Sequence, residues 1–415
     1  MPTRIISDTI LSRKGSTRAT LYNWTNKIVT LDGKTHVSWL DFLAACQIQT
    51  LDRESGEWGD MDTVGCGVDN HCGPAICIDS HGHLHYVVGS HGRSPFQHRR
   101  SLEPNSHDTW SPYFFVGVGP TYPSLVCDRD DQLHLTYRGT HNSNWMSNRP
   151  APYLMYQRAD IGSEWLPPIE LVRTVEPYGY TQYGNAFCID RQNRIHLVFH
   201  FTEGYPEGHG RYTGYLRSLD GGNTWTKANG EKVLIPADHH LVDKLCEYED
   251  GQLHVSNVAC DLNDQPYTII FGAPEAGHAD LMWHDGERWN KRPLLDEIRQ
   301  VRPDGFISAD ATLAFDRDGS LYIAIQTSTN LEDWGRDGAE VVLLYSEDGG
   351  ENFEALHISE PGDSVPCWQP SLEMVSSFHQ ETPEVPTMTY TRGIKGTGCT
   401  SRDYTEVHFV MFEKD

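Results

Sequence analysis

Short runs of alternating apolar and polar residues, separated by turn residues, fill most of this sequence. Residues 77–87 read Cys-Ile-Asp-Ser-His-Gly-His-Leu-His-Tyr-Val, and the same pattern recurs at 127–137 and 188–198. Shorter copies begin at Cys260 and Phe315. Asp, Asn and Gly supply a tight turn between two apolar-alternating arms, so each copy predicts a β-hairpin. Long helical periodicity is hard to find, and we therefore predict an all-β protein.

The spacing of these copies predicts the architecture. Each copy has an aspartate just before its turn, and these anchor aspartates are Asp79, Asp128, Asp190, Asp261 and Asp316. They lie about 50 to 70 residues apart, so 415 residues hold about seven units. Repeats of this length are typical of a β-propeller, and we predict seven four-stranded antiparallel blades. Because closing the ring joins all blades, we expect one domain over residues 1–415.

A second motif agrees with this fold. Residues 218–225 read Ser-Leu-Asp-Gly-Gly-Asn-Thr-Trp, a complete Asp-box, and residues 346–353 are a near copy. Asp-boxes cap the outer hairpins of propeller blades in sialidase-like and other carbohydrate-active proteins. They indicate the fold strongly and the function weakly.

Charge and composition exclude several classes of function. Lys and Arg number 33 against 58 Asp and Glu, which gives a formal net charge of −25 and argues against a nucleic-acid partner. No run approaches the roughly 18 apolar residues of a membrane span, and the first residues show no signal-peptide core. We expect a protein that is secreted if a leader was removed and cytoplasmic otherwise, without a membrane partner and monomeric. The ten cysteines are too dilute for a disulfide scaffold.

The repeats separate structural histidines from candidate functional ones. His85, His134 and His196 each stand six residues after an anchor aspartate, which predicts a packing role repeated in every blade. Other polar residues flank the hairpins at the end opposite the turn, where the later blades carry different types. If successive blades are neighbours, these side chains converge near the central channel. They are His71, His91, Tyr122, Arg138, Tyr183 and His200.

This group favours elimination over hydrolysis. Glycosidases usually need two carboxylates, and only Glu203 lies near the group in the sequence. Elimination from a uronate needs a cation on the carboxylate, a base for the C5 proton and an acid for the leaving O4. Arg suits the first role, and Tyr and His suit the other two. Ordinary residues lining a propeller mouth are the alternative interpretation.

At these residues the sequence resembles the seven-bladed propeller polysaccharide lyases, the ulvan lyases and related rhamnose-glucuronate lyases. The resemblance spans about residues 60 to 350. It rests on Asn70-His71 with His91 twenty residues later, and on Tyr122-Pro123 with Tyr137-Arg138-Gly139. It implies cleavage of a rhamnose-glucuronic acid linkage with a 4,5-unsaturated product, from an anionic polymer or oligosaccharide of the ulvan or gum arabic side-chain type.

The resemblance also implies residue roles. Arg138 would neutralise the carboxylate, and His71, His91 and Tyr122 would carry the proton transfers, with base and acid left open. Four residues would bind the substrate: Tyr180, Tyr183, Asn185 and His200.

The remaining alternatives concern metals and other functions. No cofactor is required and no metal site is assigned, although a structural divalent ion stays an alternative. A zinc site from His239, His240, Cys246, His254 and Cys260 fits no standard spacing. A sialidase-like hydrolase is disfavoured because the sequence has no Arg-Ile-Pro motif near its start and no clear arginine triad. A non-catalytic carbohydrate-binding propeller stays open.

Overall fold

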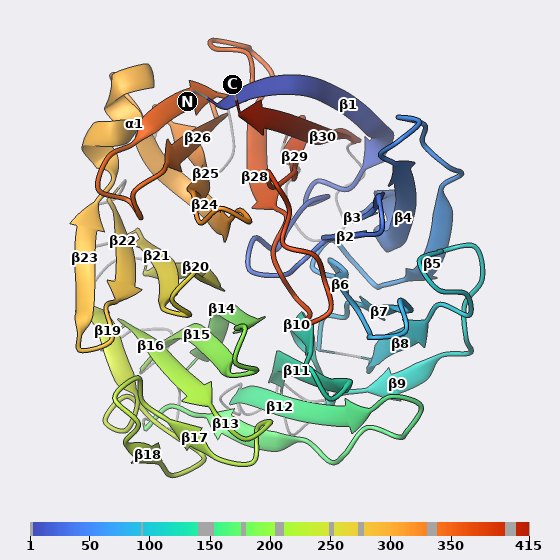
Figure 1. Ribbon diagram of the computed structural model, residues 1–415, viewed down its shortest axis with the longest axis vertical. Helices are drawn as coiled ribbons and strands as arrows, with labels where there is room; N and C mark the ends of the chain where they lie inside the picture. The colour runs from blue at the N-terminus through green and yellow to red at the C-terminus, as the bar shows by residue number, and fades with distance from the viewer. Residues whose placement is uncertain are drawn as a thin grey trace.

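The computed structural model places the chain in a ring of β-sheets around a central axis (Figure 1). It describes residues 3–92, 94–139, 153–175, 180–203, 211–248, 253–272, 278–329, 338–394 and 404–414. Within these ranges the side chains of residues 180–183 and 309 are not described. The seven sheets are antiparallel, and the first strand of each blade lies beside the first strand of a neighbouring blade.

The first four blades follow in chain order. Blade 1 contains β2 (Ile28–Leu31), β3 (Lys34–Leu40), β4 (Ala45–Asp52) and β5 (Asp62–Cys66), with the short 3-10 helix η1 (Phe42–Ala44) before β4. Blade 2 contains β6 (Ala75–Ile78), β7 (Leu84–Val88), β8 (Phe96–Arg100) and β9 (Phe114–Val116). Blade 3 contains β10 (Thr121–Cys127), β11 (Gln132–Gly139), β12 (Tyr153–Asp160) and β13 (Ile169–Val172). Blade 4 contains β14 (Tyr180–Ile189), β15 (Ile195–Thr202), β16 (Arg211–Ser218), β17 (Trp225–Thr226), β18 (Lys232–Val233) and β19 (Asp243–Tyr248).

The last three blades complete the ring. Blade 5 contains β20 (His254–Cys260), β21 (Pro266–Phe271), β22 (Ala279–His284) and β23 (Trp289–Pro293). Helix α1 (Leu295–Val301) leads to blade 6, which contains β24 (Phe306–Phe315), β25 (Leu321–Ser328), β26 (Glu340–Ser346) and β27 (Glu354–His357). Blade 7 contains β28 (Cys367–Leu372), β29 (Met388–Arg392), β30 (Thr405–Lys414) and β1 (Thr3–Gly15). The predicted seven-bladed, all-β propeller is confirmed, and only blade 4 departs from four strands.

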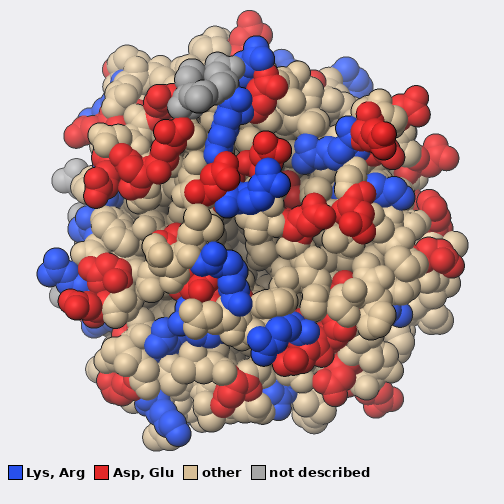
Figure 2. All heavy atoms as spheres, in the orientation of Figure 1, with Lys and Arg blue, Asp and Glu red and all other residues tan. Residues whose placement is uncertain are grey.

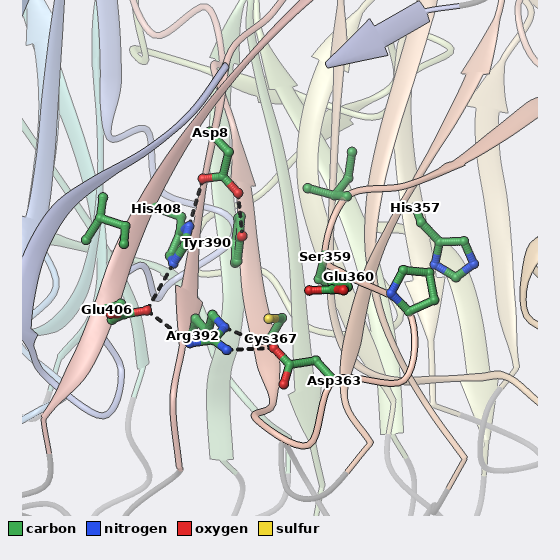
Figure 3. A pocket seen from close by; sticks show the side chains of 13 residues that line it. Asp8, His357, Ser359, Glu360, Asp363, Cys367, Tyr390, Arg392, Glu406 and His408 are labelled. Atoms are coloured by element: carbon green, nitrogen blue, oxygen red, sulfur yellow. Dashed lines mark hydrogen bonds and ion pairs between the residues drawn. The ribbon is translucent and has the colours of Figure 1, made fainter. Parts of the chain in front are cut away.

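Blade 7 closes the ring by pairing the two ends of the sequence. Strand β1 lies antiparallel to β30, with Thr3 opposite Lys414. The Asp8 carboxylate of β1 accepts hydrogen bonds from His408 Nδ1 at 2.7 Å and from the Tyr390 hydroxyl at 2.8 Å. These groups line a cavity of about 540 Å³ in which Arg392 bridges Asp363 and Glu406 (Figure 3). Polar contacts therefore hold the first strand to the last two.

The anchor aspartates explain why the inner hairpins form. In all five, one carboxylate oxygen accepts the backbone N–H groups two and four residues later, as Asp79 does from His81 and His83 at 2.9 Å. The other oxygen of Asp79 accepts Nε2–H of His85 at 3.2 Å. His134 and His196 repeat this contact, and so does the Tyr322 hydroxyl at the same register. The predicted structural role of these three histidines is confirmed.

The two Asp-boxes form the outer turns after β16 and β26, as predicted. Asp220 accepts a hydrogen bond from the Thr224 backbone at 2.8 Å and from its hydroxyl at 2.7 Å, while Trp225 is buried. Gly222 has φ = 78°, and a Cβ there would lie 1.8 Å from the Tyr156 hydroxyl oxygen. Only glycine fits both constraints.

Residues 16–27, which we call the axial segment, connect β1 to β2 and are almost entirely buried. The Thr20 hydroxyl donates to the carbonyl of Gln369, and the Asn23 amide donates to that of Ala311. The Thr25 hydroxyl donates to the carbonyl of Pro123 at 2.8 Å. The axial segment therefore contacts blades on opposite sides of the ring and reaches the strand that carries Tyr122.

Candidate functional site

The structure brings the four predicted catalytic residues together at the end of the inner hairpins opposite the anchor turns. His71 lies in the connection between β5 and β6, and His91 follows β7 and pairs with Thr121. The two imidazoles stack with centroids 4.0 Å apart. The ring of Tyr122 lies 6.2 Å from that of His71, and the Arg138 guanidinium carbon lies 4.7 Å from the centre of the Tyr122 ring.

Asp69 joins the two histidines and is absent from the residues predicted above. Its Oδ1 accepts the backbone N–H of His71 at 2.8 Å and lies 3.1 Å from His71 Nδ1. Its Oδ2 lies 2.6 Å from Nδ1 of His91. An ionised carboxylate only accepts hydrogen bonds, so both Nδ1 atoms carry a proton and are directed at Asp69. The Asp-x-His spacing of residues 69–71 is the one signal in the sequence, and it lies outside the repeats.

The protonation states follow from burial and hydrogen bonding. Burial lowers the pKa of His71 to about 4, and the opposing hydrogen bond to Asp69 offsets this only in part. Burial acts to raise the pKa of Asp69, but hydrogen bonds from His71 and His91 hold it well below its usual range. At neutral pH, His71 is therefore a neutral base and Asp69 is an anion.

An aromatic layer forms the floor beneath the histidines. Tyr122 is 2% exposed, whereas the His91 side chain is 28% exposed. Burial within the candidate site therefore increases from His91 to Tyr122. The axial segment places Tyr22 edge-on to Tyr122 with centroids 4.4 Å apart, and Trp24 stacks on Tyr22. Burial raises the pKa of Tyr22 well above its ordinary value, so its phenol stays protonated.

Tyr122 adopts an uncommon backbone conformation. Its φ is 62°, in the left-handed region, and the register of β10 against β11 shifts between Thr121 and Ser124. Such a conformation costs free energy in a non-glycine residue and persists where surrounding contacts hold it. Arg138 contributes one such contact, because its guanidinium donates to the Thr121 hydroxyl oxygen at 3.0 Å.

The predicted substrate-binding residues fall into two groups. Asn185 is fully buried and donates to the carbonyl of Tyr122 at 3.3 Å. His200 is 4% exposed and accepts the backbone N–H of Gly184 at Nδ1, and burial places its pKa well below the ordinary value. Asn185 therefore contacts the backbone of a site residue, whereas His200 contacts the backbone of its own blade, and binding of substrate by either stays a prediction. Tyr180 and Tyr183 lie on β14, but their side chains lie outside the described residues.

Metal-ligating side chains gather at one place in the described part of the chain. Ligand atoms of Asp69, His71 and His91 lie within 4.8 Å of one another. The alternative zinc set forms no such group among the described residues, and His239 lies 3.2 Å from Glu203 instead. The described helices also include none with the length and apolar character needed to cross a bilayer.

Comparisons with known proteins agree with this fold. The ulvan lyase of Nonlabens ulvanivorans is 22% identical, over 78% of this chain and 74% of the relative. The PL25 ulvan lyase of Pseudoalteromonas sp. (strain PLSV) is also 22% identical, over 78% of this chain and 72% of its own. A PL25 ulvan lyase structure bound to -[GlcA(1-4)Rha3S]- superposes with a TM-score of 0.70 and 15% identity, covering 96% of this chain and 94% of that one. The structure of polysaccharide lyase Uly1 gives a TM-score of 0.61 at 11% identity, with coverages of 98% and 99%.

These matches confirm the resemblance to propeller polysaccharide lyases that the motifs indicate. A family model described as a BNR repeat-containing family member matches residues 34–297. Because that match covers well over half of the sequence, the chain belongs to the BNR repeat-containing family.

Proposed function

We propose that this protein is a polysaccharide lyase that cleaves the bond to O4 of a uronic acid by β-elimination. The observation that carries the proposal is the pair of stacked histidines held by one ionised carboxylate above Tyr122 and Arg138. Similarity to ulvan lyases, one of them bound to a glucuronate-rhamnose sulfate chain, supports a linkage of the rhamnose-glucuronic acid type.

We infer the following roles from charge and geometry. The Arg138 guanidinium binds the uronate carboxylate and makes the neighbouring C5 proton more acidic. Nε2 of His91 removes that proton, and Asp69 stabilises the imidazolium that forms, as a carboxylate does for a catalytic histidine. The electron pair of the C5–H bond forms the C4–C5 double bond as the C4–O4 bond breaks. The Tyr122 phenol gives its proton to the leaving oxygen, and exchange with water restores both groups.

The same geometry argues against hydrolysis. Most glycosidases use a carboxylic acid of raised pKa beside a second carboxylate. Asp69 has the opposite property, because its hydrogen bonds to both histidines lower its pKa. Both of its oxygens are already engaged by His71 and His91.

Substrate charge requires a local recognition site. A net charge of −25 repels an anionic polymer at long range, and salt screens this effect beyond about 8 to 10 Å. On the face drawn in Figure 2, basic and acidic side chains are interspersed around the ring. Attraction of a uronate therefore depends on close contact with Arg138 and the histidines.

The test is ultraviolet absorbance from the new double bond, measured with ulvan, gum arabic and a neutral polysaccharide. The parent protein should produce the signal from a uronate polymer only, and Arg138→Ala should abolish it. Arg302→Ala is the matched control, because Arg302 is equally buried at 8% exposure and also donates to a threonine hydroxyl. New reducing ends without absorbance would indicate a hydrolase, and silence in both assays would indicate a binding propeller; either would overturn the proposal.

A further inference from the structure

Two exposed aromatic side chains lie at the outer edge of blade 2, where Phe115 is on β9 and Tyr113 directly precedes that strand. Tyr113 is 42% exposed and Phe115 is 67% exposed. Their rings lie nearly parallel, at 28°, with centroids 6.5 Å apart. The two rings therefore stack on each other, and we call them the platform. Large exposed aromatic rings placed together mark an interaction surface.

The platform lies in the seam between blades 1 and 2. Phe115 stands opposite Gln97 across β8 and β9, and the Gln97 amide donates to the carbonyl of Cys66 at 3.2 Å. The Tyr113 hydroxyl donates to the carbonyl of Val64 at 3.3 Å. From Cys66 the chain reaches Asp69 in three residues, which span at most about 11 Å. The platform therefore contacts the segment that leads directly to Asp69.

A positive charge lies under the platform. The Arg99 guanidinium carbon is 4.7 Å from the centre of the Tyr113 ring, and its nitrogens donate to the carbonyls of Ser111, Val64 and Trp110. Among the described residues, no acidic side chain forms an ion pair with Arg99. In a chain of net charge −25, this cation beside two aromatic rings fits an anionic ligand.

We propose that Tyr113, Phe115 and Arg99 form an accessory subsite for further sugar units of the anionic polysaccharide whose uronate is cleaved at Arg138. The apolar C–H face of a sugar ring would stack on Phe115, and Arg99 would face a carboxylate or sulfate. This inference rests on the proposed function and adds that the enzyme binds a chain longer than the pair of sugars at the cleaved bond.

The neighbouring residue Phe114 is a matched control. It is 41% exposed on the same strand but points to the other side, toward the ring of His98 at 6.0 Å. Phe115→Ala and Phe114→Ala therefore remove the same ring from opposite faces of one strand. Both positions are exposed, and thermal midpoints close to that of the parent protein would verify that each variant folds.

The experiment measures binding and turnover separately. Affinity of ulvan for each variant is measured in an Arg138→Ala background, and KM is measured in the active background for ulvan and for its shortest cleavable oligosaccharide. Phe115→Ala should weaken polymer binding and raise the polymer KM roughly fivefold or more, without changing kcat or the oligosaccharide KM. Phe114→Ala should leave these quantities unchanged.

Three results would overturn the inference. Equal polymer affinity of the parent and Phe115→Ala proteins, or equal losses in both variants, would exclude the subsite while leaving the lyase proposal intact. A parent protein that neither binds nor cleaves any uronate polymer would overturn the lyase proposal and this inference together.

Discussion

Replacing Asp69 by Asn tests whether one carboxylate sets the tautomers of both histidines. An amide has one oxygen that accepts and one NH2 group that donates, so it satisfies only one of the two Nδ1–H groups. The Nδ1 atom of the other ring must then accept a hydrogen bond from the amide NH2 group. That ring therefore changes tautomer and carries its proton on Nε2. Losing one hydrogen bond to a charged group costs about 1.5 to 3 kcal/mol, which corresponds to a roughly 10- to 150-fold lower kcat.

The pH profile provides a second measure of the same change. The Asp69 carboxylate favours the charged form of His71 through its hydrogen bond and its charge. Without Asp69 the His71 imidazolium loses its proton more easily, so the acid limb that His71 contributes to kcat/KM should move to lower pH. KM should change little, since Asp69 holds the histidines and not the substrate.

Asp79→Asn is the matched control, because Asp79 also binds a histidine, His85 of blade 2. Burial acts to raise the pKa of Asp79, but hydrogen bonds from His85 and the His83 backbone hold it low, as the histidines do for Asp69. This variant should lose stability in the hairpin and retain kcat. The reasoning is refuted if Asp69→Asn keeps kcat within about twofold of the parent value, or if both variants lose kcat equally.

Three further predictions concern stability and metals. Burial lowers the pKa of His36 to about 4, so the folded protein favours the neutral ring. The contribution of this group to the free energy of unfolding is fully present above pH 6.5 and is lost as pH falls toward 4. The free energy of unfolding in urea should fall by about 3 kcal/mol from this group, and His36→Gln should flatten that dependence. Asp8→Asn should cost about 1 to 3 kcal/mol in the same assay, because His408 loses a charged acceptor; an unchanged midpoint would contradict the closure described for blade 7. Zn²⁺ should inhibit turnover by binding at Asp69, His71 and His91, and this inhibition should strengthen as pH rises. EDTA should reverse the inhibition. Equally strong inhibition of Asp69→Asn would place the metal elsewhere.

Local turn chemistry made most of the fold predictable. Five hairpins share an anchor aspartate whose hydrogen bonds lie within five residues, so the sequence alone displays them. The hairpins β2–β3 and β28–β29 have no such anchor, because Leu31-Asp32-Gly33-Lys34 is a shorter turn and residues 373–387 form a long connection. Their existence followed only from dividing the length by the repeat.

The site was predictable where it follows the register of the repeats. His91, Tyr122 and Arg138 occupy fixed positions relative to the anchor turns, so neighbouring blades bring them together. Asp69 lies in a connection between blades, and Tyr22 reaches Tyr122 from a segment about 100 residues away. Contacts of this kind depend on how the ring closes, which no local pattern encodes.

The axial segment has a consequence for the order of folding. Its position depends on β1, which must wait for β30 to be synthesised before it can pair. Contacts between segments so distant in the chain form slowly, because a long loop must close first. Tyr22 and Trp24 therefore reach the Tyr122 ring only when the ring of blades closes. A nascent chain with most of its blades formed still lacks these aromatic contacts at the candidate site. The protein would acquire activity in one late step, and a circular permutant that joins β30 to β1 through a short linker should acquire it sooner.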